Sequence, residues 1–382
     1  MNQIRDAAVL GAGIAGSSLA KALADRGWDV VLVDRHSFPR HKVCGEFLSP
    51  ESRSMLSRLG LHEAVESLQP SLIDRARLFF GDGKPLELPL PGTAIGVSRH
   101  SLDAALHRAA LQAGVHIQTG AAVTSIAPDG NGYAIETKQG GVRAILRARA
   151  VIAAWGANGR SALLSDHRPE REGQQPYIGV KSHFAGIEME PAVELYFVEG
   201  GYVGLSPVEG GLVNAAALLK RSAFPNTEKS ILGWLNAAGR RNPALHGKLN
   251  QAIPVHGTQT AVAPVQLHRK PMPWGVIPHV GDAALMLPPL CGDGMAMALR
   301  SAILCATLAD RYLSGAISRS EWKHAYTAAI LREFNGPLKW GRLLQWLSGV
   351  PVLPRMLFGA ARLSPGLANG LVQATRLKES DI

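Results

Sequence analysis

The stretch that most constrains the fold is residues 7–35, where a glycine-rich turn separates two apolar segments. Ala7–Leu10 is typical of a short buried strand, and Gly11–Gly16 (GAGIAG) is typical of a turn that opens a helix. Asp29–Val33 then predicts a second strand, which ends in Asp34. This order of strand, turn, helix and strand predicts a Rossmann-like α/β domain that binds a dinucleotide.

Each glycine of the turn has its own steric task in such a site. Gly11 allows the sharp turn, Gly13 allows the backbone to approach a pyrophosphate, and Gly16 allows the helix to pack closely on the strand. The first amides of the helix then face the anion. Asp34 follows at the distance where a carboxylate accepts hydrogen bonds from a ribose, about 20 residues further on.

Two other interpretations compete for this stretch. Residues 7–20 could be the apolar part of a signal peptide behind Arg5, but no Ala-x-Ala cleavage context is present and cleavage would destroy the strand and turn. The turn could also be purely structural and bind nothing. The acid at the tip of the second strand argues against that interpretation.

The composition excludes several classes of protein. With 382 residues, 46% hydrophobic and 18% charged, the chain can form two domains or one domain with large insertions. The net charge of +10 is spread without long basic runs, which favours a soluble basic enzyme over a nucleic-acid-binding protein. Three cysteines make no disulfide framework and, without a signal peptide, indicate the cytoplasm. The sequence contains no HExxH, HxxxH or CxxC pattern, so we expect no metal site. It contains no run of 18 apolar residues, so we expect no membrane-spanning helix.

The rest of the chain alternates between nucleotide-domain elements and a second sheet. Residues 72–97 predict a hairpin, and residues 177–219 predict several antiparallel strands that would wall a substrate cavity. Residues 228–250 read as helical. Between the hairpin and these strands, the chain returns to helix and strand patterns of the nucleotide domain. Antiparallel strands at 121–150 predict a small flap laid over the parallel sheet. A strand is expected within 271–280, and an apolar helix from Gly294 towards Leu313.

These motifs, in this order, resemble the FAD-dependent oxidoreductases with the p-hydroxybenzoate hydroxylase fold, which include group A flavin monooxygenases and geranylgeranyl reductases. The resemblance covers most of residues 1–335. It implies an α/β fold with a discontinuous FAD-binding domain (1–70, 98–165 and 275–335), an inserted antiparallel β-sheet substrate domain (71–97 and 166–274) and a helical C-terminal tail (336–382).

The resemblance also implies FAD as cofactor and NAD(P)H as electron donor. In that family the first glycine turn with Asp34 and Arg35 would hold the ADP half, Arg99 would reach the phosphates, and the backbone of Val123 would contact adenine. Gly281-Asp282 would hold the ribityl chain, and the loop from Pro288 to Met295 would lie against the flavin ring. The expected cofactor residues are Gly11, Ala12, Gly13, Ala15, Gly16, Asp34, Arg35, Cys44, Gly45, Arg99, Val123, Gly281, Asp282, Gly292, Gly294 and Met295.

The loop from Lys42 to Pro50 is closer to the geranylgeranyl reductase branch, in which the corresponding cysteine lies beside the flavin. Cys44 and Glu46 are therefore the candidate catalytic residues. Cys44 could instead be a small packing residue, and Glu46 could be a proton donor or a solvated loop carboxylate. Just before them, Arg40, His41 and Lys42 bring positive charge that could steer phosphates.

One departure from the family concerns the second glycine turn, which reads Ala154-Trp155-Gly156 where the family carries Asp-Gly. It puts direct reduction by NADPH in doubt. No second GxGxxG follows, so electrons would come from a briefly docked NAD(P)H or a separate reductase.

Three functions fit these features. The leading expectation is a monooxygenase of secondary metabolism that uses NAD(P)H and O2 to hydroxylate or oxidise an apolar aromatic or polyketide-like molecule. The alternatives are reduction of a C=C bond in an isoprenoid or lipid, and electron transfer to a quinone. The basic tail from residue 336, with Trp340 and Leu343, could contact a membrane peripherally or pack on the FAD-binding domain. The expected partners are a lipophilic small molecule and no nucleic acid.

Overall fold

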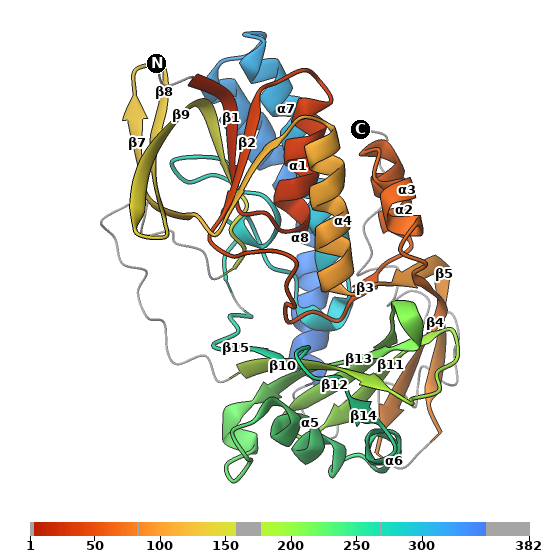
Figure 1. The fold of residues 1–382 in the computed structure, drawn as a ribbon. Coiled ribbons are helices and arrows are strands. Elements are labelled where there is room, and N and C mark those ends of the chain that lie inside the picture. Colours follow the sequence, from red (N-terminus) through yellow and green to blue (C-terminus); the bar gives the residue numbers. More distant parts are fainter. Residues whose placement is uncertain (1–3, 82–83, 158–176, 268, 349–382) are drawn as a thin grey trace.

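The computed structural model describes residues 4–81, 84–157, 177–267 and 269–348. Within them two sheets lie at opposite ends of the molecule, joined by long helices (Figure 1). The predicted α/β class with an added antiparallel sheet is confirmed.

The first sheet has six strands in the order β6-β2-β1-β9-β8-β7. Its parallel part places β1 beside β2 and β9, with β6 at the edge. The predicted flap is not a separate layer, because the 12-residue β9 pairs with β8 through its first half and with β1 through its second. The antiparallel strands therefore continue the nucleotide sheet. The strand bounds are β1 (Ile4–Leu10), β2 (Val30–Asp34), β6 (His116–Thr119), β7 (Ala122–Asp129), β8 (Gly132–Gln139) and β9 (Val142–Ala153).

Helices α1 (Ile14–Ala24), α4 (Arg99–Gln112) and α7 (Gly294–Leu313) pack together against this sheet (Figure 1). The predicted start of α7 at Gly294 and its end at Leu313 are confirmed. Helix α8 (Arg319–Ser348) runs without interruption through residue 336, where the tail was expected to begin. Short helices α2 (Glu51–Arg58) and α3 (His62–Glu66) complete this part.

The second sheet has the order β14-β10-β13-β12-β11-β4-β5-β3, and β15 also pairs with β10. The predicted hairpin of β4 and β5 belongs to it, and β4 runs parallel to β11. The loop after Lys42 contributes β3, where no regular element was expected. The bounds are β3 (Phe47–Leu48), β4 (Ser71–Phe80), β5 (Leu86–Gly96), β10 (Tyr177–Ala185), β11 (Ala192–Val198), β12 (Gly201–Pro207), β13 (Val213–Lys220), β14 (Ile253–Pro254) and β15 (Thr260–Val262).

One face of the second sheet is covered by α5 (Ile231–Gly239) and α6 (Pro243–Asn250), which share its apolar core. The helical character expected over 228–250 is confirmed, and it is divided between these two helices. The side chain of Asn242 accepts a hydrogen bond from the Leu245 amide, and Pro243 occupies the first turn, so a new helix begins there. The other face of the sheet is turned towards the first sheet (Figure 1).

Three other expectations concern the linking segments. Residues 271–280 form isolated bridges, with Trp274 paired to Pro278 and His279 to Ala153, in place of a regular strand. The expected domain boundary at 165 and the tail beyond 348 lie outside the described residues. No helix in the described part of the chain is long and apolar enough to cross a membrane.

Candidate functional site

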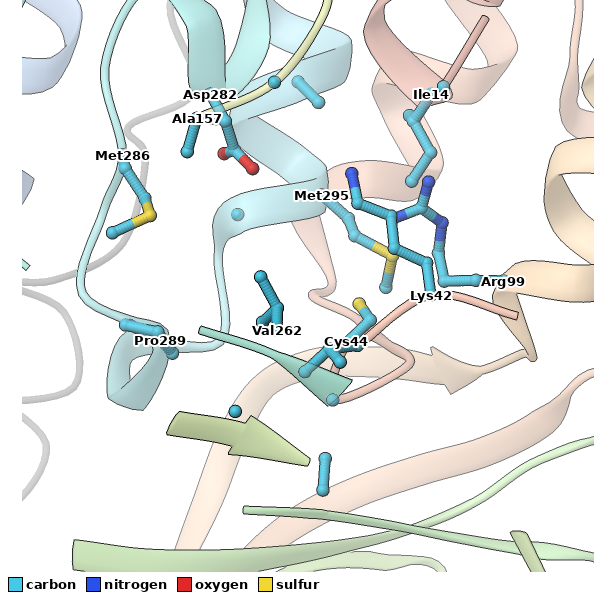
Figure 2. Close-up of a pocket in the computed structure, with 18 of the residues that line it drawn as sticks. Ile14, Lys42, Cys44, Arg99, Ala157, Val262, Asp282, Met286, Pro289 and Met295 are labelled. Atoms are coloured by element: carbon cyan, nitrogen blue, oxygen red, sulfur yellow. The ribbon is translucent and has the colours of Figure 1, made fainter. Parts of the chain in front are cut away.

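A cavity of about 780 Å³ lies between the two sheets and is lined by residues from both. Its upper end contacts the first glycine turn and the tip of β2. Its lower end is bounded by aliphatic and aromatic side chains of β4, β5, β11 and β12. Figure 2 shows Lys42, Arg99 and Met295 grouped on one side, with Asp282, Met286 and Pro289 facing them.

The first glycine turn is shaped by two backbone contacts that leave no room for a Cβ. Gly11 has φ +117°, and a Cβ there would overlap the carbonyl of Ala154. A Cβ on Gly16 would overlap the carbonyl oxygen of Gly11. Gly13 is different, because the nearest atom to its Cβ position is an Arg99 nitrogen 3.7 Å away. Gly13 and the first turn of α1, which has no side-chain cap, therefore face the cavity.

Asp34 fixes the other side of this turn. Its Oδ2 accepts a hydrogen bond from the Ala12 amide at 2.8 Å, and its Oδ1 accepts one from the His36 amide at 2.8 Å. The carboxylate is thus held at the end of β2 with its edge on the cavity, where Arg35 and Val123 also lie.

Arg99 supplies fixed positive charge beside Gly13. Its guanidinium donates to both oxygens of Asp103, at 3.0 and 2.8 Å, and is almost fully buried. Burial alone would lower the pKa of Arg99, but the carboxylate of Asp103 and the adjacent Cys44 thiol raise it. Arg99 therefore stays charged and has a defined orientation.

The cations of the preceding loop are distributed unequally. Arg40 and Lys42 line the cavity, and burial lowers the pKa of both. Among the residues that the structure describes, no carboxylate forms an ion pair with Lys42. His41 does not supply the expected charge, because burial and then the charge of Lys181 lower its pKa to about 4. His41 is neutral at pH 7.

Cys44 lies on the cavity wall and is partly exposed to it. Its carbonyl oxygen accepts a hydrogen bond from Asn214 Nδ2 of β13 at 3.0 Å, and its sulfur accepts a weak one from the Glu46 amide at 3.4 Å. Its sulfur points to the side of the cavity on which Lys42 and Arg99 lie (Figure 2). The segment Cys44–Glu46, called the Cys44 strap below, is thus fixed to the second sheet, and the Cys44 sulfur points towards the first sheet.

Glu46 is fully buried, so the solvated-carboxylate interpretation is wrong. Its Oε1 accepts hydrogen bonds from Lys181 Nζ at 2.5 Å and from the Arg99 amide at 2.8 Å, and its Oε2 lies 2.6 Å from His183 Nε2. Burial alone would raise the pKa of Glu46, but the hydrogen bond to His183 and the charge of Lys181 outweigh it, so the pKa is lowered. A carboxylate kept ionised in this way is a poor proton donor at neutral pH.

The opposite wall is formed by the two glycine motifs that precede α7. Gly281 has φ +58°, and its amide donates to Ser301 Oγ at 2.8 Å. Gly292 has φ +73° and lies against the ring of Phe47. Asp282, Gly294 and Met295 line the cavity, and α7 begins there without a side-chain cap.

Of the expected site residues, all line the cavity except Ala12 and Gly16, which are buried in the packing of the turn. Sequence reasoning missed Lys181, His183 and Asn214, the polar partners of the Cys44–Glu46 strap. One signal was available. Lys181 and His183 are two residues apart in an otherwise apolar strand, so they share a face, and charged residues on a buried face indicate a buried partner.

These residues fit FAD. Two helix N-termini without side-chain caps face the cavity, and Arg40, Lys42 and Arg99 add positive charge at the end where Gly13 leaves the backbone accessible. A pyrophosphate needs such groups. Asp34 would hold the ribose, Asp282 would hold the ribityl chain, and the Gly292–Met295 corner would lie against the ring.

Comparison with known proteins gives consistent matches. Residues 5–320 match a family model described as FAD binding domain. A menaquinone reductase of Mycolicibacterium smegmatis is 29% identical over 332 residues, which are 81% of this chain and 77% of the relative. Digeranylgeranylglycerophospholipid reductase 2 of Methanopyrus kandleri is 27% identical over 83% of this chain and 78% of the relative. The solved structure of the myxobacterial chondrochloren halogenase, at 21% identity, superimposes with a TM-score of 0.76 over 96% of this chain and 91% of that chain.

Proposed function

Because the chain belongs to the FAD binding domain family and is an FAD-dependent oxidoreductase, we propose that it reduces a carbon–carbon double bond in a lipophilic substrate that carries an isoprenoid chain. NAD(P)H or a separate reductase would supply the electrons.

The observation that carries this proposal is the continuity of the cavity. One space extends from the glycine turn, past Cys44, to a floor made by leucines and aromatic residues of the second sheet. A bound flavin would therefore face an apolar arm, and such an arm suits a long hydrocarbon. The two relatives named above are a menaquinone reductase and a phospholipid reductase, whose substrates are lipophilic.

The chain's own residues would bind, orient and protonate. FAD supplies the hydride when it is bound and reduced. The N-termini of α1 and α7 favour negative charge on the cofactor. The second carbon of the double bond needs a proton. Glu46, held as a carboxylate, is a poor donor, whereas the thiol of Cys44 lies on the cavity wall. We assign the proton to the Cys44 thiol, with Arg99 stabilising the thiolate that remains.

The monooxygenase expectation has less support than the reductase. The likeness to a halogenase, at 21% identity, concerns the fold alone. The two relatives with higher identity are both named as reductases.

An anaerobic single turnover separates the two activities. Holoenzyme reduced in the absence of oxygen is mixed with a menaquinone whose chain is unsaturated, and the product is analysed by mass spectrometry. After the quinone ring has been reoxidised with ferricyanide, we expect a product that has gained two hydrogens in its isoprenoid chain. A product that forms only when O2 is admitted, and that has gained an oxygen atom, would contradict the proposal in favour of a monooxygenase.

Replacing Cys44 tests the proton assignment. Cys44→Ser is expected to retain stoichiometric FAD but to lower kcat by about 100-fold, the scale of a lost proton donor, with little change in KM. Cys305→Ser is the matched control, since Cys305 is buried within α7 away from the cavity, and its kcat should stay near that of the parent. Equal kcat values for Cys44→Ser and the parent would return Cys44 to a packing role.

A further inference from the structure

We propose that Gly204 is a specificity-determining residue, which keeps open a channel across the second sheet along which the apolar chain of the substrate extends away from the cofactor. The proposal rests on the proposed function and adds the position and direction of that chain.

The pairing of the strands aligns one residue from each of five strands. The line, called the floor row below, consists of Ala216 (β13), Gly204 (β12), Leu195 (β11), Leu78 (β4) and Leu86 (β5). All five line the cavity. Neighbouring strands are about 4.8 Å apart, so the row is about 19 Å long.

Within the floor row, Gly204 has no side chain and so leaves the channel open near its β13 end. Residues two positions away on β12 point to the same side, so Tyr202 and Ser206 flank Gly204 on the cavity side. A Cβ on Gly204 would lie 3.3 Å from Leu195 Cδ2, which is the end of a flexible side chain. A methyl group can be accommodated by a small movement, but a larger side chain must project into the channel.

The predicted flavin loop lies at one end of the channel, which gives the substrate chain a direction. At the β13 end, Asn214 holds the Cys44 strap. Leu290 of the predicted flavin loop and Met286, just before that loop, pack with Tyr202 and Leu218. At the β5 end the lining side chains are leucines, namely Leu86, Leu88 and Leu90. The reacting end of the substrate therefore belongs at the β13 end, next to the predicted flavin loop, and its apolar tail extends towards β5.

The test uses naphthoquinones that carry one, two or four isoprene units, and their binding to oxidised holoenzyme is followed by flavin fluorescence. Affinity of the parent should rise with chain length, by up to about fourfold for each buried methylene. Gly204→Leu should weaken binding of the four-unit quinone at least tenfold and that of the one-unit quinone less than twofold. Gly204→Ala should lie close to the parent. If the leucine variant does not fold, Gly204→Val takes its place.

A second variant tests the direction. Leu86→Trp fills the far end of the floor row, so it should weaken binding of the four-unit quinone and leave the two-unit quinone unaffected. Equal losses for all chain lengths, no loss in Gly204→Leu, or no binding by the parent would overturn the proposal. If the naphthoquinones bind with this dependence on chain length but are not reduced, the proposed channel is supported and the proposed function is contradicted.

Discussion

Glu46→Gln is expected to lower the free energy of unfolding by about 3–5 kcal/mol at pH 7, because it leaves a buried charge without its counter-charge. Lys181 is fully buried, and Glu46 is its ion-pair partner at 2.5 Å among the described residues. Glutamine has the same shape as glutamate and keeps one oxygen acceptor, so the loss of stability reports the missing negative charge. Denaturant unfolding of the holoenzyme and of the variant measures the difference.

The pH dependence of that difference is a second signature. Since the folded pKa of Glu46 is lowered from its ordinary value of 4.5, its stabilising effect is complete above that value. The effect is lost as the pH falls through the folded pKa, so the gap between parent and variant should close in acid. A gap that persists unchanged in acid would contradict the ionised state of Glu46.

Two controls separate the charge from the capping of α4. Glu209 binds the same helix start, accepting hydrogen bonds from the amide and hydroxyl of Ser98, but it does not contact Lys181. Glu209→Gln should therefore cost less, about 1.5–3 kcal/mol. Lys181→Met combined with Glu46→Gln removes both charges and should recover part of the loss. No recovery in the double variant would mean that Glu46 acts only through the Arg99 amide.

Gly16→Ala is expected to abolish FAD binding and to destabilise the protein by about 3 kcal/mol or more. The new methyl group would overlap the carbonyl oxygen of Gly11 and would lie 3.0 Å from Ala154 Cβ. Two backbone segments meet there, so the clash can be relieved only by moving α1 away from the turn that it positions. The flavin absorbance of the purified protein and its thermal unfolding report the two effects.

The matched control is Gly247→Ala, in helix α6. No atom lies within 4 Å of the Cβ position of Gly247, and alanine is favoured over glycine in a helix by about 1 kcal/mol. This variant should be yellow and at least as stable as the parent. A Gly16→Ala protein with stoichiometric FAD would show that the close approach is not required.

The glycine turn was predictable because its constraints are local. Gly11, Gly13 and Gly16 act within one strand–turn–helix unit, and the spacing to Asp34 spans one crossover. The same holds for the start of α7 at Gly294. The expectation of a flap laid over the parallel sheet was wrong because its outcome depends on distant strands. Whether β9 pairs on both sides depends on neighbouring strands that periodicity does not reveal.

The sequence by itself determined the α/β class, the dinucleotide turn and the residues that gather around it, because each follows from steric rules within a few tens of residues. Only the tertiary structure decided what Glu46 does, since its partners Lys181 and His183 lie 135 and 137 residues away and become neighbours when the second sheet closes on the strap. The open floor at Gly204 was likewise decided by strand register, because register sets which side chains share a face and how much space they leave.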